Sequence, residues 1–262
     1  MRSSACRGLV ALAVGAAGGC DLVFGVDGDA APCGDESFAT AASSAVVTAD
    51  AFSVSWAGDR IVYERSGELD EQPLPAGAPS EIRASSYVPL AIALAPEGDA
   101  MFYTAEGEPP LLQAIVRSGA GWQLDPVVPD GATAGVPSAA EFGPRRVLVR
   151  VRSGWPEVQE YEADGDRWRP VGDVHALGDV AVLGSVARAP NLTPSGLDMI
   201  YAVPDGDAPA VFIAHRASTA AWFGPPVAIL PGSHAFPQLL GRCRTLYALE
   251  AAPSMTVRRY DR

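Results

Sequence analysis

The sequence predicts an all-β fold, specifically a β-propeller, and three observations support this prediction. Residues 38–262 contain no convincing amphipathic helix. Their short apolar or alternating stretches are bounded by Gly, Pro and Asp at intervals of roughly 8–12 residues, as in sandwiches, barrels and propellers. A sequence pattern also recurs at spacings of 40 to 52 residues. Periods of about 40–50 residues, with about four strands each, are typical of propeller blades.

The repeat is clearest in residues 94–103 (LAPEGDAMFY) and 192–201 (LTPSGLDMIY), which share Leu, Pro, Gly, Met and Tyr without a gap. Residues 58–63 repeat the second half, and residues 244–247 and 146–149 are weaker copies. Five copies predict five blades of four antiparallel strands. The prediction requires four tyrosines to lie in central strands of successive, equivalent sheets: Tyr63, Tyr103, Tyr201 and Tyr247.

The second half of each unit predicts a third strand and a hairpin to an outer strand. An extended segment and a turn precede Trp122, Trp168 and Trp222, and a proline follows soon after each tryptophan. We expect these three side chains to pack across the outer hairpin. Trp155 lies outside this register and is the candidate for an exposed, ligand-contacting aromatic residue, with a structural role as the alternative.

The last unit lacks residues for an outer strand, because the chain ends soon after the predicted strand 255–260. An unpaired edge would expose a row of backbone donors and acceptors, which propellers avoid by closing the ring. We therefore expect a strand within residues 38–48 to complete the last sheet.

One segment resembles a known family. Residues 192–201, followed by FIAHRAS at 212–218 and WFGPP at 222–226, resemble the WD-repeat-like propeller repeat of TolB-type periplasmic proteins. That family usually has Ser-Pro-Asp-Gly in the turn, whereas Glu97 and Ser195 stand where the aspartate is expected. The resemblance implies a fold and carries over no catalytic residue.

The N-terminus has the zones of a bacterial export signal: Arg2 and Arg7, an apolar run, then small residues before Cys20. An apolar run of about ten residues is roughly half of what a membrane-spanning helix needs. Residues 17–20 (AGGC) resemble the lipobox of bacterial lipoproteins, which implies lipidation of Cys20, with ordinary secretion or an accidental cysteine as alternatives. We expect a signal peptide at 1–19, a lipidated, flexible tether at 20–37 and the propeller at 38–262.

Two cysteines remain for the exported domain, since Cys6 leaves with the signal and Cys20 is the lipidation candidate. An oxidising compartment favours a disulfide between Cys33 and Cys243, which would lock the ring closure. The loop of about 210 residues would restrict the unfolded chain by about 5 kcal/mol. The alternative is two free thiols.

Composition excludes several functions. The formal net charge is −12 and the chain has no lysine. Nucleic acid is therefore not an expected partner, because phosphate backbones are bound by basic surfaces. The absence of lysine excludes a Walker-type phosphate site, a Schiff base and a serine–lysine dyad. We expect no cofactor.

Residues that could carry chemistry have simpler interpretations. No nucleophile-elbow motif accompanies the three histidines His175, His215 and His234, so surface or packing roles are expected. The segments 164–166 and 205–207 (both DGD) lack the further ligands of a calcium loop and are expected to be turns, so no metal site is predicted. A glycosidase would need paired carboxylates in a central funnel, for which the candidates are Glu97, Asp99, Glu141 and Asp179.

The leading functional hypothesis is a non-enzymatic binding or scaffold module of the cell envelope, which presents one face of the ring to a protein or a glycan. Its contact with the membrane would be the lipid anchor alone. The first alternative is a propeller-type glycoside hydrolase or lyase with carboxylates in the central funnel. The second is a degenerate paralogue with only a structural role. The sequence leaves the partner, the oligomeric state and the choice between inner and outer membrane open.

Overall fold

A computed structural model describes residues 32–82, 89–95, 98–105, 111–119, 121–125, 138–141, 145–150, 157–164, 167–176, 188–193, 195–203, 208–240, 243–250 and 255–262. All of them belong to one compact unit, Pro32–Arg262. These residues form strands and no helix, and so no helix that could span a membrane is found in this part of the chain.

Twenty strands make up the described part of the chain. They are β1 (Ala42–Thr48), β2 (Ala51–Val54), β3 (Arg60–Arg65), β4 (Glu68–Pro73), β5 (Ser80–Glu81), β6 (Pro89–Leu94), β7 (Ala100–Ala105), β8 (Leu111–Ser118), β9 (Gly121–Asp125), β10 (Ser138–Glu141), β11 (Arg145–Arg150), β12 (Glu157–Asp164), β13 (Arg167–Ala176), β14 (Arg188–Leu192), β15 (Asp198–Val203), β16 (Ala210–His215), β17 (Val227–Pro231), β18 (His234–Leu240), β19 (Thr245–Glu250) and β20 (Thr256–Asp261).

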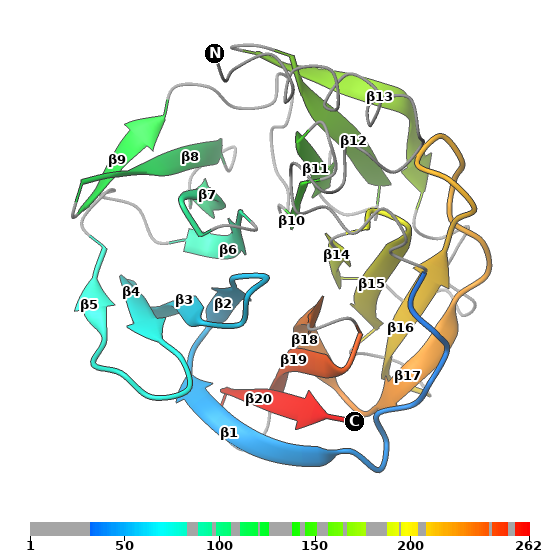
Figure 1. Ribbon diagram of the computed structural model, residues 1–262, viewed down its shortest axis with the longest axis horizontal. Helices are drawn as coiled ribbons and strands as arrows, with labels where there is room; N and C mark the ends of the chain where they lie inside the picture. The colour runs from blue at the N-terminus through cyan, green and yellow to red at the C-terminus, as the bar shows by residue number, and fades with distance from the viewer. Residues whose placement is uncertain are drawn as a thin grey trace, which may run out of the picture. The chain divides into compact units, whose positions relative to one another are not determined.

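The strands form five four-stranded antiparallel sheets. In chain order these are β2-β3-β4-β5, β6-β7-β8-β9, β10-β11-β12-β13, β14-β15-β16-β17, and β18-β19-β20 completed by β1. We number them first to fifth. The innermost strands β2, β6, β10, β14 and β18 each contact the next, and β18 contacts β2. Figure 1 shows the resulting ring of sheets about a common axis. The predicted propeller fold is confirmed.

The predicted ring closure is also confirmed. Strand β1 pairs antiparallel with β20, from Ala42 opposite Asp261 to Thr48 opposite Thr256. The N-terminal strand therefore supplies the outer strand of the fifth sheet (Figure 1). Because both ends of the domain meet in one sheet, β20 is paired on both sides and the fifth sheet has four strands like the others.

The four repeated tyrosines occupy equivalent places. Each lies in the second strand of a different sheet, and each is at most 2% exposed: Tyr63 in β3, Tyr103 in β7, Tyr201 in β15 and Tyr247 in β19. Burial of such large side chains on the faces between neighbouring sheets is the main favourable term that holds the blades together.

A tight turn with positive φ leads into the second strand of each of these four sheets. The turn residue stands two positions before the strand and has φ between 65° and 71° at Gly58, Gly98, Gly196 and Cys243. Glycine adopts this conformation without steric cost, whereas other residues rarely do. In the fifth sheet Cys243 stands where the other three units have the turn glycine.

An arginine recurs at the end of the third strand. The backbone N–H groups of Arg117, Arg216 and Arg262 each donate to the carbonyl just before the second strand, at 2.7, 2.9 and 3.1 Å. Their guanidinium groups lie 4.3–4.6 Å from the ring centroids of Trp122, Phe223 and Phe38, respectively. Cation–π stacking of this kind fixes the end of the third strand to the segment that packs outside it.

The register expected for the tryptophans is wrong in one copy. Phe223, not Trp222, lies under Arg216, while Trp222 packs edge-to-face on Phe223 at 5.2 Å. The reason is the longer connection after Arg216, which reaches β17 only at Val227. The other two tryptophans lie in outer strands: Trp122 is half-buried and Trp168 is buried, with an edge-to-face contact to Phe102 of the second sheet.

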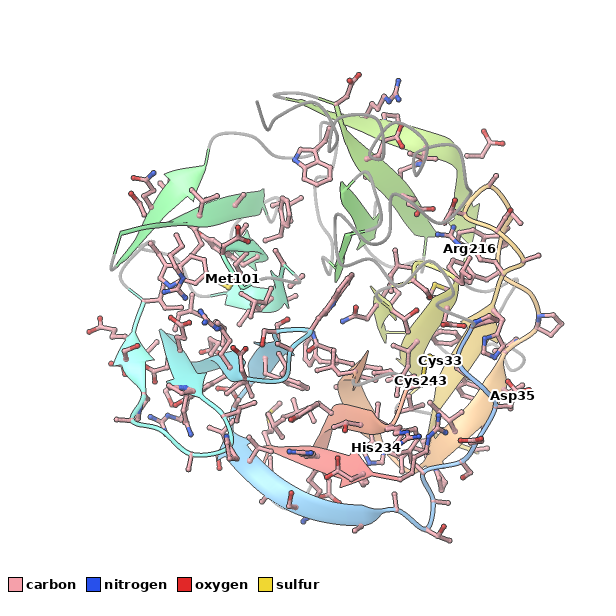
Figure 2. All side chains as sticks on the ribbon, in the orientation of Figure 1. Cys33, Asp35, Met101, Arg216, His234 and Cys243 are labelled. Carbon is pink, nitrogen blue, oxygen red and sulfur yellow. A yellow bond between two sulfur atoms is a disulfide. The ribbon has the colours of Figure 1, made fainter. Side chains whose placement is uncertain are left out.

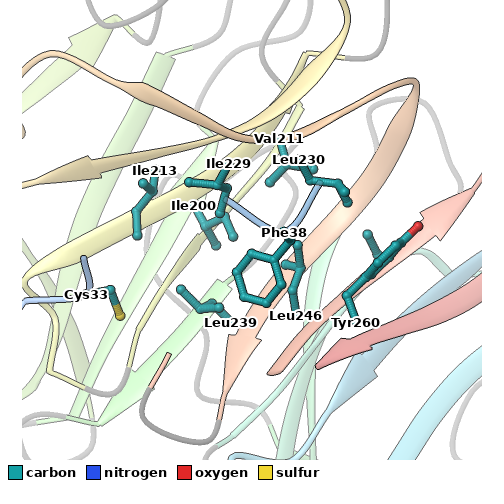
Figure 3. Close-up of a cluster of buried hydrophobic side chains, with 11 residues drawn as sticks. Cys33, Phe38, Ile200, Val211, Ile213, Ile229, Leu230, Leu239, Leu246 and Tyr260 are labelled. Atoms are coloured by element: carbon teal, nitrogen blue, oxygen red, sulfur yellow. The ribbon is translucent and has the colours of Figure 1, made fainter. Parts of the chain in front are cut away.

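Buried side chains of the fourth and fifth sheets meet in one hydrophobic cluster (Figure 3). Phe38, which is 1% exposed, lies in this cluster beside residues of both sheets. The segment just before β1 therefore contributes to the propeller core through Phe38. The described domain begins at Pro32, six residues before the boundary that the sequence suggests.

Candidate functional site

Two regions of the described chain gather polar side chains: a pocket on the ring axis, and a network on the outer side of the fourth sheet. The axial pocket is small, with a cavity volume of about 10 Å³, which is room for about one water molecule. Four inner strands or the turns that follow them contribute to it. Its lining includes Ser53, Trp56, Ala93, Asn191, Gln238 and Leu240.

Hydrogen bonds across three sheets fix part of the pocket wall. Gln238 of β18 accepts from the backbone N–H of Val54 at 2.7 Å and donates to Ser53 Oγ at 2.8 Å. The same Ser53 oxygen accepts from the backbone N–H of Leu94 at 2.8 Å. These polar groups are buried and satisfied, so they form a rigid wall of fixed shape.

Trp56 is the aromatic residue of this pocket. It follows β2 and stands two residues before Gly58, where the repeat has Pro96 and Pro194. The half-buried indole packs against two core clusters, one with Leu192 of the fourth sheet and one with Val54 of the first. The sequence analysis did not single out Trp56. Its position in the repeat, where two other units have proline, is the signal that distinguishes it.

The residues singled out in the sequence are distributed as follows. Trp155 and Cys20 lie outside the described residues, as do Glu97, Asp179, Asp166, Asp205 and Asp207. Asp99 is exposed in the turn before β7, and Glu141 is described only as part of β10. No carboxylate is found among the described residues that line the axial pocket.

Asp164 is exposed and pairs with Arg167 across the β12–β13 hairpin. No group of three metal-ligating side chains is found in the described part of the chain.

The second region is the N-terminal strap, which we define as residues 32–38. Cys33 forms a disulfide with Cys243, with the Cα atoms 5.6 Å apart. The backbone N–H of Phe38 donates to the Ile229 carbonyl of β17 at 2.6 Å. Figure 2 shows Cys33 beside Cys243, with Asp35 farther along the same strap. The strap is therefore fixed to both the fourth and the fifth sheet.

Asp198 organises the polar contacts beneath the strap. Its side chain is fully buried. One carboxylate oxygen, Oδ2, accepts from the backbone N–H of Cys33 and from Thr193 Oγ1, both at 3.0 Å. The other, Oδ1, lies 2.6 Å from Nδ1 of His215. Both carboxylate oxygens of Asp198 therefore have hydrogen-bond partners, as a buried polar group requires.

His215 links Asp198 to the strap. Its Nε2 atom lies 2.7 Å from Oδ1 of Asp35. Burial lowers the pKa of His215, but the hydrogen bonds and the negative charges of Asp198 and Asp35 outweigh this effect and raise the pKa above its ordinary value. The expected surface or packing role of His215 is therefore incomplete, because the ring bridges two carboxylates from distant parts of the chain.

This network does not have the geometry of a serine hydrolase. Ser195 Oγ lies 3.1 Å from Thr193 Oγ1 and 3.5 Å from Asp198 Oδ2, and it accepts from the backbone N–H of Leu197 at 3.1 Å. A nucleophilic serine would instead donate to the imidazole. Here both imidazole nitrogens contact carboxylates, so neither is available to take a proton from a serine. The arrangement holds Asp35 of the strap against the fourth sheet.

His234 has the packing role that we expected. Its ring is buried, with Nδ1 3.0 Å from the Gly232 carbonyl and Nε2 3.1 Å from the Tyr260 hydroxyl. Burial lowers its pKa. The side chain of His175 is not among those described.

Comparison with known proteins supports the fold. No family model and no curated protein matches the chain. A gluconolactonase from Xanthomonas campestris has a similar structure, with a TM-score of 0.51 at 12% identity, over 79% of this chain and 70% of that one. TolB from Acinetobacter baumannii gives 0.49 at 14% identity, over 85% of this chain and 55% of that one. The β-propeller domain of Cps50 (Swd1) from Myceliophteria thermophila gives 0.45 at 10% identity, over 81% and 83%.

The chain thus spans just over half the length of the Acinetobacter TolB structure. At these identities the likeness shows the fold alone. A TolB structure is among the structural neighbours, as the sequence resemblance leads one to expect.

Proposed function

We propose that this chain is an envelope-anchored, non-enzymatic binding module that uses the Trp56 end of its ring axis to bind a partner in the envelope. The observation that carries the proposal is the composition of the axial pocket, where an indole stands beside amide and hydroxyl groups on inner strands from several sheets. Propellers commonly present binding sites where the sheets converge.

The chemistry of the described lining favours a neutral glycan over a charged ligand. The described lining carries no charged side chain, and the half-buried indole of Trp56 is its aromatic group. Ser53 and Gln238 already bond to one another and to the backbone, so they give the wall its shape rather than direct contacts. No described lining residue titrates near neutral pH, and the Ser53 hydroxyl accepts from Gln238 and from the Leu94 backbone instead of lying beside a base that could activate it. This supports binding rather than catalysis.

The location is part of the same proposal. The signal-like N-terminus, the AGGC segment ending at Cys20 and a disulfide suited to an oxidising compartment support an exported, lipid-anchored protein. A diacylated cysteine supplies two acyl chains, which is enough for stable membrane attachment.

The experiment is a glycan array probed with the full chain, followed by titration of the best ligand into wild type, Trp56→Ala and Trp222→Phe. Trp222 lies on the outer hairpin and is the matched control. We expect Trp56→Ala to weaken binding at least roughly tenfold, because a lost stacking contact of about 1.4 kcal/mol corresponds to that factor. We expect Trp222→Phe to leave the affinity unchanged. Equal binding by all three proteins, or no glycan bound, would reject the axial glycan site.

Two further outcomes of this experiment separate the alternatives. Release of a reducing sugar from a bound glycan would indicate the hydrolase alternative and reject the non-enzymatic proposal. Capture of an envelope protein that is lost in Trp56→Ala would keep the axial site and replace the glycan by a protein partner.

A further inference from the structure

The N-terminal strap is attached to the ring by contacts of two kinds. The first kind does not depend on pH near neutrality: the Cys33–Cys243 disulfide and the backbone hydrogen bond from Phe38 to Ile229. The second kind is ionic and passes through His215, whose ordinary pKa of 6.5 places its charge change near neutral pH.

We propose that Asp35, His215 and Asp198 form a pH-sensitive clasp, which seats the strap on the fourth sheet when His215 is charged and releases Asp35 when His215 loses its proton. The clasp spans 180 residues of sequence between Asp35 and His215. It therefore joins the segment that leads to the predicted membrane anchor to the end of strand β16 in the fourth sheet.

The geometry requires a charged ring. The two ring nitrogens lie 2.6 and 2.7 Å from carboxylate oxygens of Asp198 and Asp35. Neutral imidazole has one N–H and one lone pair, so it can donate to one carboxylate only. The lone pair would then face the second carboxylate at hydrogen-bond distance, and this contact is repulsive. Two such contacts are satisfied together when both nitrogens carry protons.

The contact that breaks on deprotonation is the outer one. Asp198 is fully buried and also accepts from Thr193 and from the Cys33 backbone, so moving it would leave buried donors unsatisfied. Asp35 has a side-chain exposure of 57% and can be hydrated where it stands. The remaining proton therefore stays on Nδ1, and the Asp35 end of the strap separates from the ring.

No other described charge faces the imidazole from the elements packed around it. The neighbouring Arg216 side chain binds Glu160 and the Gly196 carbonyl. On the strap, Glu36 lies 3.6 Å from Arg262 instead. The turn below contributes the uncharged hydroxyls of Thr193 and Ser195, and the segment after Arg216 contributes the backbone N–H of Gly224 to the His215 carbonyl.

The direction of the switch follows from these contacts. Because the two carboxylates raise the pKa of His215, the clasp is closed while the pH is below that raised pKa and opens as the pH rises through it. The disulfide stays intact, so opening frees the Asp35 end of the strap without unpairing β1.

The test compares the full-length wild type with Asp35→Asn and Glu36→Gln, which remove one negative charge each from adjacent strap positions. Histidine-selective NMR gives the pKa and protonation of His215, and hydrogen exchange of the amides of residues 34–37, corrected for the intrinsic rate, gives opening of the strap around Asp35. We expect wild type and Glu36→Gln to show several-fold faster corrected exchange above the His215 midpoint. We expect Asp35→Asn to lower that midpoint and to exchange quickly at every pH.

Three results would overturn the proposal. One is a His215 midpoint at or below that of an unstructured histidine peptide. Another is a corrected exchange of the strap that does not change across the His215 titration in wild type. The third is an identical response of Asp35→Asn and Glu36→Gln, which would show that the effect is one of overall charge rather than of the clasp.

Discussion

Glu160 of β12 and Arg216, which follows β16, form a bidentate ion pair that joins the third sheet to the fourth. The two guanidinium-to-carboxylate distances are 2.9 and 3.0 Å, and the side chains are only 7% and 1% exposed. Arg216 Nε also donates to the Gly196 carbonyl at 2.6 Å. Each of the three guanidinium nitrogens thus donates a hydrogen bond, and such bonds are what makes a buried ion pair tolerable.

Removing the carboxylate charge should strongly destabilise the domain. We expect Glu160→Gln to lower the free energy of unfolding by about 3 kcal/mol or more, because it leaves a buried guanidinium uncompensated. The matched control is Glu162→Gln in the same strand, whose partner Arg169 is 62% exposed, and which should cost less than about 1 kcal/mol. Urea unfolding measures both, and equal losses for the two variants would contradict the prediction.

The same device joins the first two sheets. Arg117, the counterpart of Arg216, reaches Glu71 of β4 in the preceding sheet, and Glu71 also accepts from Arg60 at 3.1 Å. The repeat reveals the equivalence of Arg117 and Arg216 in the sequence. It does not reveal their partners, since each glutamate lies in the preceding unit and no spacing within one repeat connects the two.

The turn at Cys243 gives a prediction about backbone strain. Cys243 has φ of 66°, a conformation that glycine adopts in the equivalent turns. Loss of the disulfide, with its loop of 210 residues, should cost about 5 kcal/mol in the chain-entropy model. Within the Cys33→Ser background, Cys243→Gly should be more stable than Cys243→Ser by about 1–2 kcal/mol, because a non-glycine residue pays that cost at positive φ.

Thermal or urea unfolding of the two double variants decides this point. Both lack the disulfide and both lack the Cys243 thiol, so each is the control for the other. A Cys243→Gly variant that is no more stable than the serine variant would show that the turn changes its conformation once the bridge is gone.

The pH dependence of stability should contain opposite contributions from two histidines. Burial lowers the pKa of His234, so its contribution to stability is complete above the unfolded pKa of 6.5 and is lost as the pH falls below it. The pKa of His215 is raised, so its contribution is complete below 6.5 and is lost as the pH rises through the raised value.

Variants separate these two effects. We expect His234→Gln to flatten the loss of stability on the acidic side, and His215→Gln to flatten the loss on the alkaline side. The measurement is the free energy of unfolding between about pH 5 and pH 8. Two variants with the same pH profile would show that neither histidine is linked to folding in the way the contacts indicate.

The sequence predicts the fold better than the sites, for a physical reason. Tyr63, Tyr103 and Tyr201 reveal the blades because each fills the same buried place in its own sheet, and identical environments select similar residues. Asp198 and His215 instead meet Asp35, a residue outside the repeat. A contact that occurs once, between segments far apart in the chain, leaves no periodic trace.

The predicted anchor can be tested independently of the fold. Replacing Cys20 by Ser removes the one thiol of the AGGC segment that could carry a diacylglycerol. We expect the wild type to incorporate a palmitate analogue and to sediment with membranes, and Cys20→Ser to do neither. Each buried methylene contributes about 0.8 kcal/mol, and the methylenes of two acyl chains together are enough to keep the protein on the membrane.

Cys6→Ser is the matched control for this experiment, because Cys6 also lies in the first twenty residues but outside the AGGC segment. It should label and fractionate as wild type does. Absence of label on the wild-type protein would reject lipidation and leave ordinary secretion as the explanation of the signal-like N-terminus. The Cys33–Cys243 disulfide reports export, because it forms in an oxidising compartment. If the disulfide is present in Cys20→Ser as well as in Cys6→Ser, export does not depend on Cys20.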